Sequence, residues 1–426
     1  MARKMKDSGI EWIGEIPEGW ETCLYKYCCS VQPGYPFDSA KFSNSSTDGF
    51  PLIRIRDITS GEIQTYYTGE YPPNYIVTAG DLLVGMDGDF NVRWWNNDAA
   101  LLNQRCCRVT EKNSVLRRFL YYVLPLTLQH INTLTYATTV KHLANGDILN
   151  SFIAFPSLPA QQNIVHYLDT VCSEIDAILS KTRSSIEEYK KLKQAVITQA
   201  VTKGVRGERE MKDSGNPWFG QIPTDWKLSR VGLHFSIILG KMLCNAPLND
   251  TYTLEPYYCA ADVHFDGVAD GARKKMWFSP IEKDLYRVSV GDLLVVEGGA
   301  GAGGSAIVEK QDSDTYVQNS IMIVRSKGNA DNRYLRYLLE FLVKQGYIDV
   351  VCNKATIPHF TKDKLSCVPF CLCPTGEQKE IADYLDAKCA EIDKLIAKKE
   401  QLVKELENYK KSLIFEYVTG KKELRR

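Results

Sequence analysis

The stretch M-K-D-S-G-I-E-W-I-G-E-I-P-E-G-W at residues 5–20 is repeated as M-K-D-S-G-N-P-W-F-G-Q-I-P-T-D-W at residues 211–226. Ten of the sixteen positions are identical at an offset of 206 residues. Further matched pairs follow in the same order, and their offset rises to 217. The matched segments are G-D-L-L-V at 80–84 and 291–295, L-N-Q-R-C-C-R-V at 102–109 and V-Q-N-S-I-M-I-V at 317–324, R-F-L-Y-Y-V-L at 118–124 and R-Y-L-R-Y-L-L at 333–339, T-V-K-H-L at 139–143 and T-I-P-H-F at 356–360, and Y-L-D-T-V-C-S-E-I-D at 167–176 and Y-L-D-A-K-C-A-E-I-D at 384–393. A period this long indicates two domains of one fold rather than a solenoid.

Each repeat begins with a mixed globular segment. F-P-L-I-R-I-R-D-I at 50–58 and both copies of G-D-L-L-V are typical of strands, and residues 117–128 and 332–343 are typical of helices. We therefore expect an α+β domain in each half. The repeated I-P-x-x-W predicts an indole buried beside a rigid turn, in preference to a binding motif.

Each repeat ends in a long helical segment with apolar residues spaced alternately by four and three, as in the seam of a coiled coil. Two matching stripes in one chain predict an antiparallel pair of helices, ~60 Å long at 1.5 Å per residue, with one domain at each end. The alternative is that each helix folds back on its own domain. The predicted seam comprises Ile164, Leu168, Val171, Ile175, Ile178, Tyr189, Leu192 and Val196, and Ile381, Leu385, Ile392, Leu395, Leu402, Leu406, Tyr409 and Leu413. The expected domains are 1–158 and 205–375, with helices at 159–204 and 376–426.

Composition excludes several classes of protein. Hydrophobic content of 44% and charged content of 24% are ordinary for a globular protein. The basic start is followed by no apolar segment, and no apolar run approaches the ~20 residues that span a bilayer, so we expect a cytoplasmic protein. The 52 basic and 52 acidic residues are spread evenly, so no segment is the polycation expected of a protein that holds nucleic acid alone.

The cysteines and histidines do not form a recognisable metal site. Thirteen cysteines is an odd number and there is no secretion signal, so a disulfide framework is not expected. Cys367, Cys371 and Cys373 lie near His359, but they lack paired C-x-x-C spacing, so we interpret them as small residues of a buried strand rather than zinc ligands.

Catalytic motifs are also missing. The G-x-G-x-x-G at 299–304 is followed by a strand-like segment instead of the helix that a dinucleotide site requires. Y-P-P-N-Y at 71–75 resembles the tetrapeptide of amino-methyltransferases only superficially, because the order is wrong. The sequence therefore favours a binding protein over an enzyme.

Two similar domains on a rigid spacer suggest two-point recognition of an extended partner such as DNA. The frame is repeated and the loops differ: D-G-D-F-N-V-R-W-W-N at 87–96 corresponds to E-G-G-A-G-A-G-G-S-A at 297–306. Such a pair is expected to recognise two different half-sites.

The chain resembles the specificity subunits of type I restriction–modification systems. The resemblance covers essentially the whole chain and rests on the two W-x-G-x-I-P-x-x-W openings, both copies of G-D-L-L-V, L-N-Q-R, T-x-x-H, and the two helices with Q-x-x-I-x-x-Y-L-D-x-x-C-x-E-I-D. It implies a bacterial or archaeal subunit with no catalysis and no cofactor of its own, which recognises a bipartite sequence in double-stranded DNA. The implied partners are two adenine methyltransferase subunits and the restriction and translocase subunits, which would use S-adenosylmethionine and ATP.

Two alternatives differ in kind: a self-contained modification enzyme, and a scaffold that joins proteins through the helices without touching DNA. Under the DNA-binding hypothesis, polar loop residues contact bases in the major groove. The candidates are Lys41, Asn44, Arg93, Trp94, Trp95, Gln104, Arg105 and Lys141 in the first domain, and Lys241, Asn245, Arg273, Lys274, Lys275, Gln318, Asn319, Lys354 and Thr356 in the second. Asn103, Gln104, Gln318 and Asn319 have the alternative of hydrogen-bonding within their domains.

Overall fold

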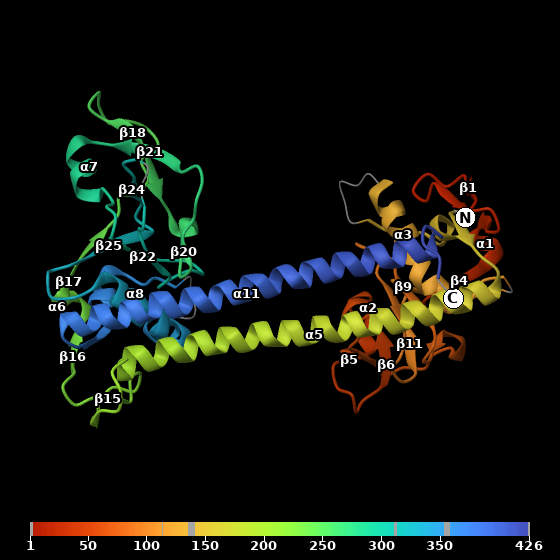
Figure 1. Ribbon diagram of the computed structural model, residues 1–426, viewed down its shortest axis with the longest axis horizontal. Helices are drawn as coiled ribbons and strands as arrows, with labels where there is room; N and C mark the ends of the chain where they lie inside the picture. Colours follow the sequence, from red (N-terminus) through yellow and green to blue (C-terminus); the bar gives the residue numbers. More distant parts are fainter. Residues whose placement is uncertain (1–2, 113, 135–140, 311–312, 353–357, 425–426) are drawn as a thin grey trace. The chain divides into compact units, whose positions relative to one another are not determined.

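A computed structural model describes residues 3–112, 114–134, 141–310, 313–352 and 358–424. Contacts divide the chain into a first unit, residues 1–182 with 401–426, and a second unit, residues 183–400. Each unit holds one globular domain and parts of two long helices, α5 (Leu158–Lys203) and α11 (Thr375–Val418), as Figure 1 shows. The predicted fold class, two similar α+β domains with two long antiparallel helices, is confirmed.

The first globular domain is built around a four-stranded antiparallel sheet in the order β10-β9-β12-β4. Side chains on β9 alternate between its two faces: Leu82 and Val84 join the core that contains α3 and the long helices, and Leu83 joins a second core on the opposite face. A second sheet, β5-β7-β6-β11-β8, covers that opposite face. The elements of the first domain, up to α5, are β1 (Met5–Asp7), β2 (Glu15–Pro17), β3 (Glu21–Leu24), α1 (Tyr25–Cys28), β4 (Cys29–Pro33), η1 (Ser39–Lys41), β5 (Phe42–Ser43), β6 (Phe50–Ile53), α2 (Ile55–Ser60), β7 (Tyr66–Tyr67), η2 (Pro73–Tyr75), β8 (Ile76–Val77), β9 (Leu82–Gly85), β10 (Val92–Trp94), β11 (Ala100–Leu102), β12 (Cys106–Glu111), α3 (Arg117–Leu134), α4 (Asn145–Leu149) and β13 (Phe152–Phe155).

The second globular domain repeats this plan. Its main sheet has the order β17-β25-β22-β23, and β22 again alternates, with Leu293 and Val295 in the core beside the helices and Leu294 in the opposite core. Its second sheet is smaller, β21-β18-β24, and a short helix, α7, lies beside it (Figure 1). The elements of the second domain, up to α11, are β14 (Met211–Asp213), β15 (Gln221–Pro223), β16 (Lys227–Arg230), α6 (Val231–His234), β17 (Phe235–Leu239), β18 (Thr253–Tyr258), η3 (Ala260–Asp262), β19 (Val263–His264), β20 (Gly267–Val268), β21 (Lys274–Phe278), α7 (Pro280–Tyr286), β22 (Leu293–Val296), β23 (Ser305–Ile307), β24 (Tyr316–Val317), β25 (Ile321–Ser326), α8 (Asn332–Lys344), α9 (Tyr347–Val351), α10 (Lys362–Ser366) and β26 (Pro369–Leu372).

One predicted strand is shorter than expected. Residues 50–58 were expected to be extended throughout, but β6 ends at Ile53 and helix α2 begins at Ile55. The Asp57 carboxylate accepts the Arg54 backbone N–H at 2.8 Å, which caps the new helix and turns the chain. The polar R-D pair therefore begins a helix instead of continuing the strand.

The repeated I-P-x-x-W has the structural role predicted for it. Trp20 and Trp226 are buried, and each lies against the glycine that ends a long helix in its unit. Gly420 follows α11 and Gly204 follows α5, both in the left-handed conformation (φ +70° and +77°). A side chain at either position would be strained, and at Gly420 it would collide with Pro17 at 2.5 Å. The motif therefore anchors the end of a helix in each unit.

The repeated helix motif holds each long helix against its own domain. Gln161 and Gln378 are completely buried. The Gln161 amide donates to the Ser114 carbonyl and accepts from Leu116 N–H, and Gln378 accepts from Asp331 N–H at 3.0 Å. About two turns further along each helix, Asp169 accepts from Arg118 and Tyr122, and Asp386 accepts from Arg333 and Tyr337. The first half of each helix thus packs on its own domain, as the alternative proposed, although the two helices also pair.

The helices run antiparallel where they meet in each unit. In the first unit Lys410 on α11 pairs with Asp176 on α5 at 2.6 Å, and in the second Lys193 on α5 pairs with Asp393 on α11 at 2.6 Å. The offset of 217 residues relates Asp176 to Asp393 and Lys193 to Lys410. The two ion pairs are therefore one interaction made twice, as internal two-fold symmetry requires.

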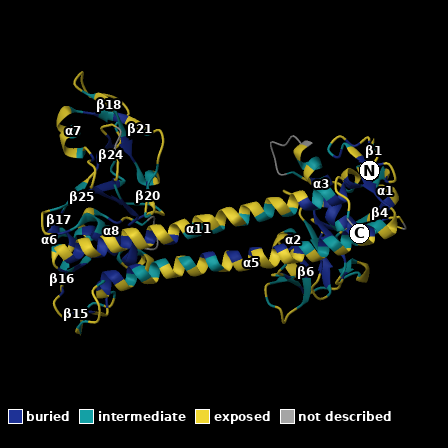
Figure 2. Cartoon of the chain, viewed as in Figure 1, coloured by how far each residue is buried: buried dark blue, intermediate teal, exposed yellow. Residues whose placement is uncertain are grey.

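The apolar seam includes twelve of the sixteen predicted residues, and the other four are exposed. Figure 2 shows buried positions recurring along both helices, but these four predicted positions are displaced by one residue. Ile178 and Leu192 are each 48% exposed, Leu402 is 42% exposed and Tyr409 is 53% exposed. Their neighbours face inward instead: Leu179 is buried, Lys193 and Lys410 form the ion pairs, and Val403 packs on the first core. The buried or partly buried members of the predicted seam are Ile164, Leu168, Val171, Ile175, Tyr189, Val196, Ile381, Leu385, Ile392, Leu395, Leu406 and Leu413.

Candidate nucleic-acid interface

The second sheet of each domain, together with the loops beside it, carries most of the exposed polar candidates. In both domains this sheet contains one parallel pair, β6 with β11 and β18 with β24. Each pair leads into a polar turn, Asn103–Arg105 in the first domain and Gln318–Ser320 in the second. The two domains therefore present different side chains from equivalent backbone positions.

A glycine packs directly against each polar turn, at a position where any side chain would collide with the backbone of the turn. A Cβ on Gly34 would lie 2.1 Å from the Asn103 carbonyl oxygen, and one on Gly240 would lie 2.4 Å from that of Gln318. Both glycines follow the last strand residue before the loop, so the loop crosses directly over the turn. We conclude that the frame fixes the backbone at both sites and leaves the side chains free to differ.

An acid–histidine contact beside each turn is also repeated. His142 Nδ1 lies 2.7 Å from Asp87, and His359 Nδ1 lies 3.3 Å from Glu297. Arg105 joins the first of these, 3.3 Å from Asp87. The histidine that ends each T-x-x-H segment thus contacts the loop that follows β9 or β22.

The first-domain candidates fall into two groups. Lys41, Asn44, Gln104 and Arg105 are exposed. The others hold the domain together: Arg93 donates to the Ile58 and Thr59 carbonyls at the end of α2, and Lys141 donates to Asn132 at 2.6 Å.

Both tryptophans at the end of β10 also have structural contacts. Trp95 is fully buried and donates its indole N–H to the Asp98 carbonyl at 3.0 Å, so the prediction of a base contact does not hold for this residue. Trp94 packs under the Arg118 guanidinium at 4.6 Å. Its ring therefore contributes to the frame that holds Asp169.

The second-domain candidates divide in the same way. Asn245, Lys274 and Lys275 are exposed. Lys241 is buried and forms a 2.5 Å ion pair with Glu282, and Arg273 donates to the Ala269 carbonyl and lies over the Tyr258 ring. Burial opposes ionisation of Glu282, but hydrogen bonds from Lys241 and Ser279 lower its pKa overall.

Gln318 and Asn319 make hydrogen bonds within their own domain, which was the alternative to DNA contact. The Gln318 amide donates to Asn319 at 2.8 Å and accepts from Ser320 at 2.6 Å, so both hydrogen-bond within the domain. Lys354 and Thr356 lie outside the described residues.

A polar hollow on the second sheet of the first domain was missed from the sequence. It has a volume of about 500 Å³ and is lined by Asn44, Ser46, Arg56, Gln64, Ile63 and Tyr66. Arginine, asparagine and glutamine are the side chains that pair most specifically with base edges. Of this set only Asn44 was predicted, because Arg56 and Gln64 meet only after the chain turns at α2.

The turn at α2 exists in both domains with different chemistry. Asp57 accepts from Arg54 N–H and Asp262 accepts from Cys259 N–H, both at 2.8 Å. Next to these equivalent carboxylates stand Arg56 and Ala261. The two turns have equivalent hydrogen bonds, but the first carries the long donor side chain of Arg56 where the second carries only the methyl group of Ala261.

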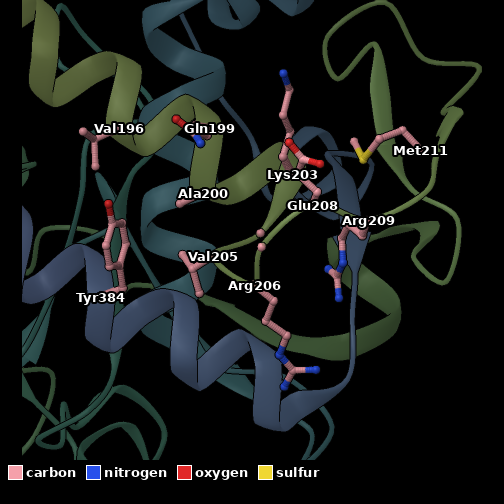
Figure 3. Close-up of a pocket in the computed structure, with 12 residues that line it drawn as sticks. Val196, Gln199, Ala200, Lys203, Val205, Arg206, Glu208, Arg209, Met211 and Tyr384 are labelled. Atoms are coloured by element: carbon pink, nitrogen blue, oxygen red, sulfur yellow. The ribbon is translucent and has the colours of Figure 1, made fainter.

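A larger hollow of about 610 Å³ lies in the second unit, where α5 ends and the chain leads to β14 (Figure 3). Its arginines are neutralised: Arg206 pairs with Glu380 at 2.8 Å and Arg209 with the buried Glu377 at 2.5 Å. The Arg206 hydrogen bond lowers the pKa of Glu380. These contacts fasten the connecting segment to α11, which makes the hollow a structural junction.

The described residues contain no group of three or more histidine, cysteine or acidic side chains placed to hold a metal. Cys371 and Cys373 are buried, as the strand interpretation predicted, and burial raises the pKa of Cys371 to about 12. The interpretation is wrong for Cys367, which is exposed because it caps helix α10 before strand β26 begins. The glycine run at 299–304 leads into strand β23, not a helix. No helix within the described ranges is long and apolar enough to cross a membrane.

The fold and these surfaces define a class of protein: a tandem recognition module, in which one frame is built twice and carries two unlike sets of polar loops. The family comparison identifies the class more narrowly. The model of the type I restriction modification DNA specificity domain matches residues 17–188 and 224–407, one copy in each half. This chain belongs to that family.

Individual relatives agree with this assignment. The chain is 36% identical over 202 residues to the type I restriction enzyme EcoBI specificity subunit of Escherichia coli, an alignment covering 47% of this chain and 42% of that protein. It is 26% identical to the putative type I restriction enzyme MjaX specificity subunit of Methanocaldococcus jannaschii, across 96% of this chain and 95% of the relative. A chain of a solved type I restriction–modification system superposes with a TM-score of 0.69 at 17% identity, covering 95% of this chain and 98% of that one. This last likeness concerns the fold alone.

Proposed function

We propose that this chain is the DNA-recognition subunit of a type I restriction–modification complex and that its two domains read different halves of a bipartite target. The observation that supports this most strongly is the contrast at the α2 turn. The carboxylates of Asp57 and Asp262 hold the same backbone turn, but Arg56 and Ala261 present different groups from it. A repeated frame with unlike exposed groups is what recognition of two different half-sites requires.

In this proposal the first domain reads bases with Asn44, Arg56, Gln64, Gln104 and Arg105. Arginine donates two hydrogen bonds to guanine, and asparagine or glutamine pairs with adenine. The second domain uses Asn245, Lys274 and Lys275 around β21, where lysine supplies contacts to guanine or phosphate.

The long helices would set the spacing of the two half-sites. α5 has 46 residues and α11 has 44, and each is divided between the two units. At 1.5 Å per residue, α5 is about 69 Å long, roughly two turns of B-DNA at about 34 Å each. A spacer of this kind favours a target whose central bases are unspecified.

Partner subunits complete the function. The chain carries 52 basic and 52 acidic residues, so it lacks the excess positive charge that gives most DNA-binding proteins their affinity for phosphates. We propose that two methyltransferase subunits clamp the duplex and methylate adenine, and that restriction and translocase subunits join them. S-adenosylmethionine and ATP then belong to the partners, and this chain itself is non-catalytic.

Mapping of methylated adenines tests the proposal. DNA of random sequence is exposed to the chain assembled with its methyltransferase subunit, to the methyltransferase alone and to the chain alone. The proposal predicts a bipartite motif in the first reaction only. Methylation by the chain alone would establish an enzyme, and absence of any enriched motif with the assembled complex would favour a scaffold that does not read DNA.

A further inference from the structure

Two free thiols meet in the first domain. Cys23 on β3 and Cys28 at the end of α1 have their sulfur atoms 2.7 Å apart. Cys23 is held by its pairing with Ile153 of β13, and the backbone carbonyl of Cys28 accepts from Lys112 N–H at 2.7 Å. The backbone is thus fixed on both sides of the contact, so the fold itself brings the two sulfur atoms together.

The two thiols differ in access. Cys23 is partly exposed, whereas Cys28 is fully buried. Burial, together with the neighbouring Cys23, raises the pKa of Cys28 to about 12. A small oxidant therefore reaches Cys23 first, and Cys28 is the thiol placed to resolve the product.

The second domain has a different pair at the equivalent positions. The offset of 206 residues relates Cys23 to Ser229 and Cys28 to His234. Ser229 Oγ and His234 Nε2 are also 2.7 Å apart. The frame therefore brings these two positions together in both domains, but only the first domain has sulfur at both.

We propose that Cys23 and Cys28 form a reversible disulfide when the chain meets hydrogen peroxide, which makes the first domain redox-sensitive at a place where the second domain carries Ser229 and His234. The Cys23 thiolate attacks one peroxide oxygen, so that an S–O bond forms, the O–O bond breaks, and the departing hydroxide takes up a proton as water. The Cys28 thiol then attacks the Cys23 sulfur, the S–O bond breaks, and the departing hydroxide takes the proton of Cys28 to become a second water. In sum two thiols and one peroxide give one disulfide and two waters, with each sulfur losing one electron.

The disulfide would fasten the point where the first domain meets its long helix. β3 pairs with β13, and β13 ends at Phe155, three residues before α5 begins at Leu158. Joining β3 to α1 restricts local opening of this two-stranded sheet, because the cross-link removes conformations open to the unfolded segment. This inference is independent of the proposed DNA-recognition function.

The test uses the full-length chain treated with hydrogen peroxide, alkylated at free thiols, and analysed by peptide mass spectrometry. We expect Cys23 and Cys28 to lose alkylation together, a Cys23–Cys28 linkage with the loss of two hydrogen atoms, and full reversal by dithiothreitol. The buried Cys106 and Cys107 serve as internal controls that stay alkylatable after unfolding. Oxidation of Cys23 alone to a sulfinic acid, pairing of either residue with another cysteine, or no reaction at all would overturn the proposal.

Hydrogen exchange gives a second readout on the unsubstituted chain, with one variant as its control. Oxidation should slow amide exchange at residues 21–28 and 152–155 and leave the equivalent residues 227–234 and 369–372 unchanged. The Cys23→Ser variant, which installs the serine found at 229, should abolish both the linkage and the slowing. Equal slowing in both domains, or slowing that persists in Cys23→Ser, would contradict the inference.

Discussion

The two units share their internal supports and differ in the surfaces that those supports carry. Gln161 and Gln378 accept from backbone N–H groups of equivalent turns, and Asp169 and Asp386 each accept from an equivalent arginine and tyrosine. By contrast, the first unit has a five-stranded second sheet with a polar hollow, and the second has three strands and helix α7. The two copies of the frame thus share their geometry and differ in their exposed chemistry, which is what the proposed recognition of two different half-sites requires.

The largest effect is expected from the helix anchors. Trp20→Ala and Trp226→Ala should each destabilise their own unit by about 3–5 kcal/mol, because each removes a buried indole. Hydrogen exchange resolved by peptide, with urea unfolding, measures this. Tyr27→Ala is the control, since Tyr27 is exposed and its loss should cost no more than about 0.5 kcal/mol. If Trp226→Ala accelerated hydrogen exchange equally in both units, the two units would unfold together and not independently.

A smaller effect is expected where each helix is fastened to its domain. Asp169→Asn and Asp386→Asn each weaken hydrogen bonds from an arginine and a tyrosine, and the carboxylates are 38% and 44% exposed. We expect losses of about 1–2 kcal/mol, discounted for solvent screening. Matching losses in thermal unfolding would support the equivalence of the two frames. A loss of stability in one unit and none in the other would show that the two units share the backbone fold but not these side-chain contacts.

The helix–helix ion pairs should contribute less. Lys410 with Asp176 and Lys193 with Asp393 are partly exposed, so Asp176→Asn or Asp393→Asn should cost about 0.2–1 kcal/mol. The effect should shrink in high salt. A double-mutant cycle for each pair measures the coupling, and unequal couplings would argue against internal two-fold symmetry.

The response to acid should distinguish the second sheets. The Lys283 hydrogen bond lowers the pKa of Glu255, and the pKa of Glu282 is also lowered, both from 4.5. Their stabilisation is therefore present above pH 4.5 and is lost as pH falls through the lower folded-state pKa. In the first unit burial raises the pKa of Asp57, so acid relieves a cost there. Hydrogen exchange should show β18 and α7 loosening on acidification before α2, and the reverse order would contradict this comparison.

The sequence predicted the architecture because the repeat shows which residues serve the frame. The two copies of G-D-L-L-V, the paired arginines 118 and 333, and the long helices all lie where the repeat indicated. The phase of the seam was not predictable, since apolar residues stand at both Ile178 and Leu179, and only the antiparallel partner determines which faces inward. A one-residue error in phase exchanges the buried and the exposed member of such a pair.

The candidate site was less predictable for a related reason. Trp95, Lys241 and Arg273 have the composition of binding residues but are occupied by internal contacts with Asp98, Glu282 and Ala269. Arg56, on the other hand, lies in a segment that looks like one continuous strand until Asp57 caps a helix, and Gln64 follows that helix. Loop side chains depend on tertiary hydrogen bonds that single-sequence patterns do not encode.

The most direct test of two unlike readers on one frame is a map of methylated sites for three versions of the assembled complex: wild type, Arg56→Ala, and Lys274→Ala with Lys275→Ala. Arg56→Ala should relax one half of the motif, by about 1–3 kcal/mol of discrimination, and leave the other half unchanged. The lysine variant should affect only the opposite half. If either variant altered both halves, or if the wild-type motif were a single uninterrupted sequence, the account would be contradicted.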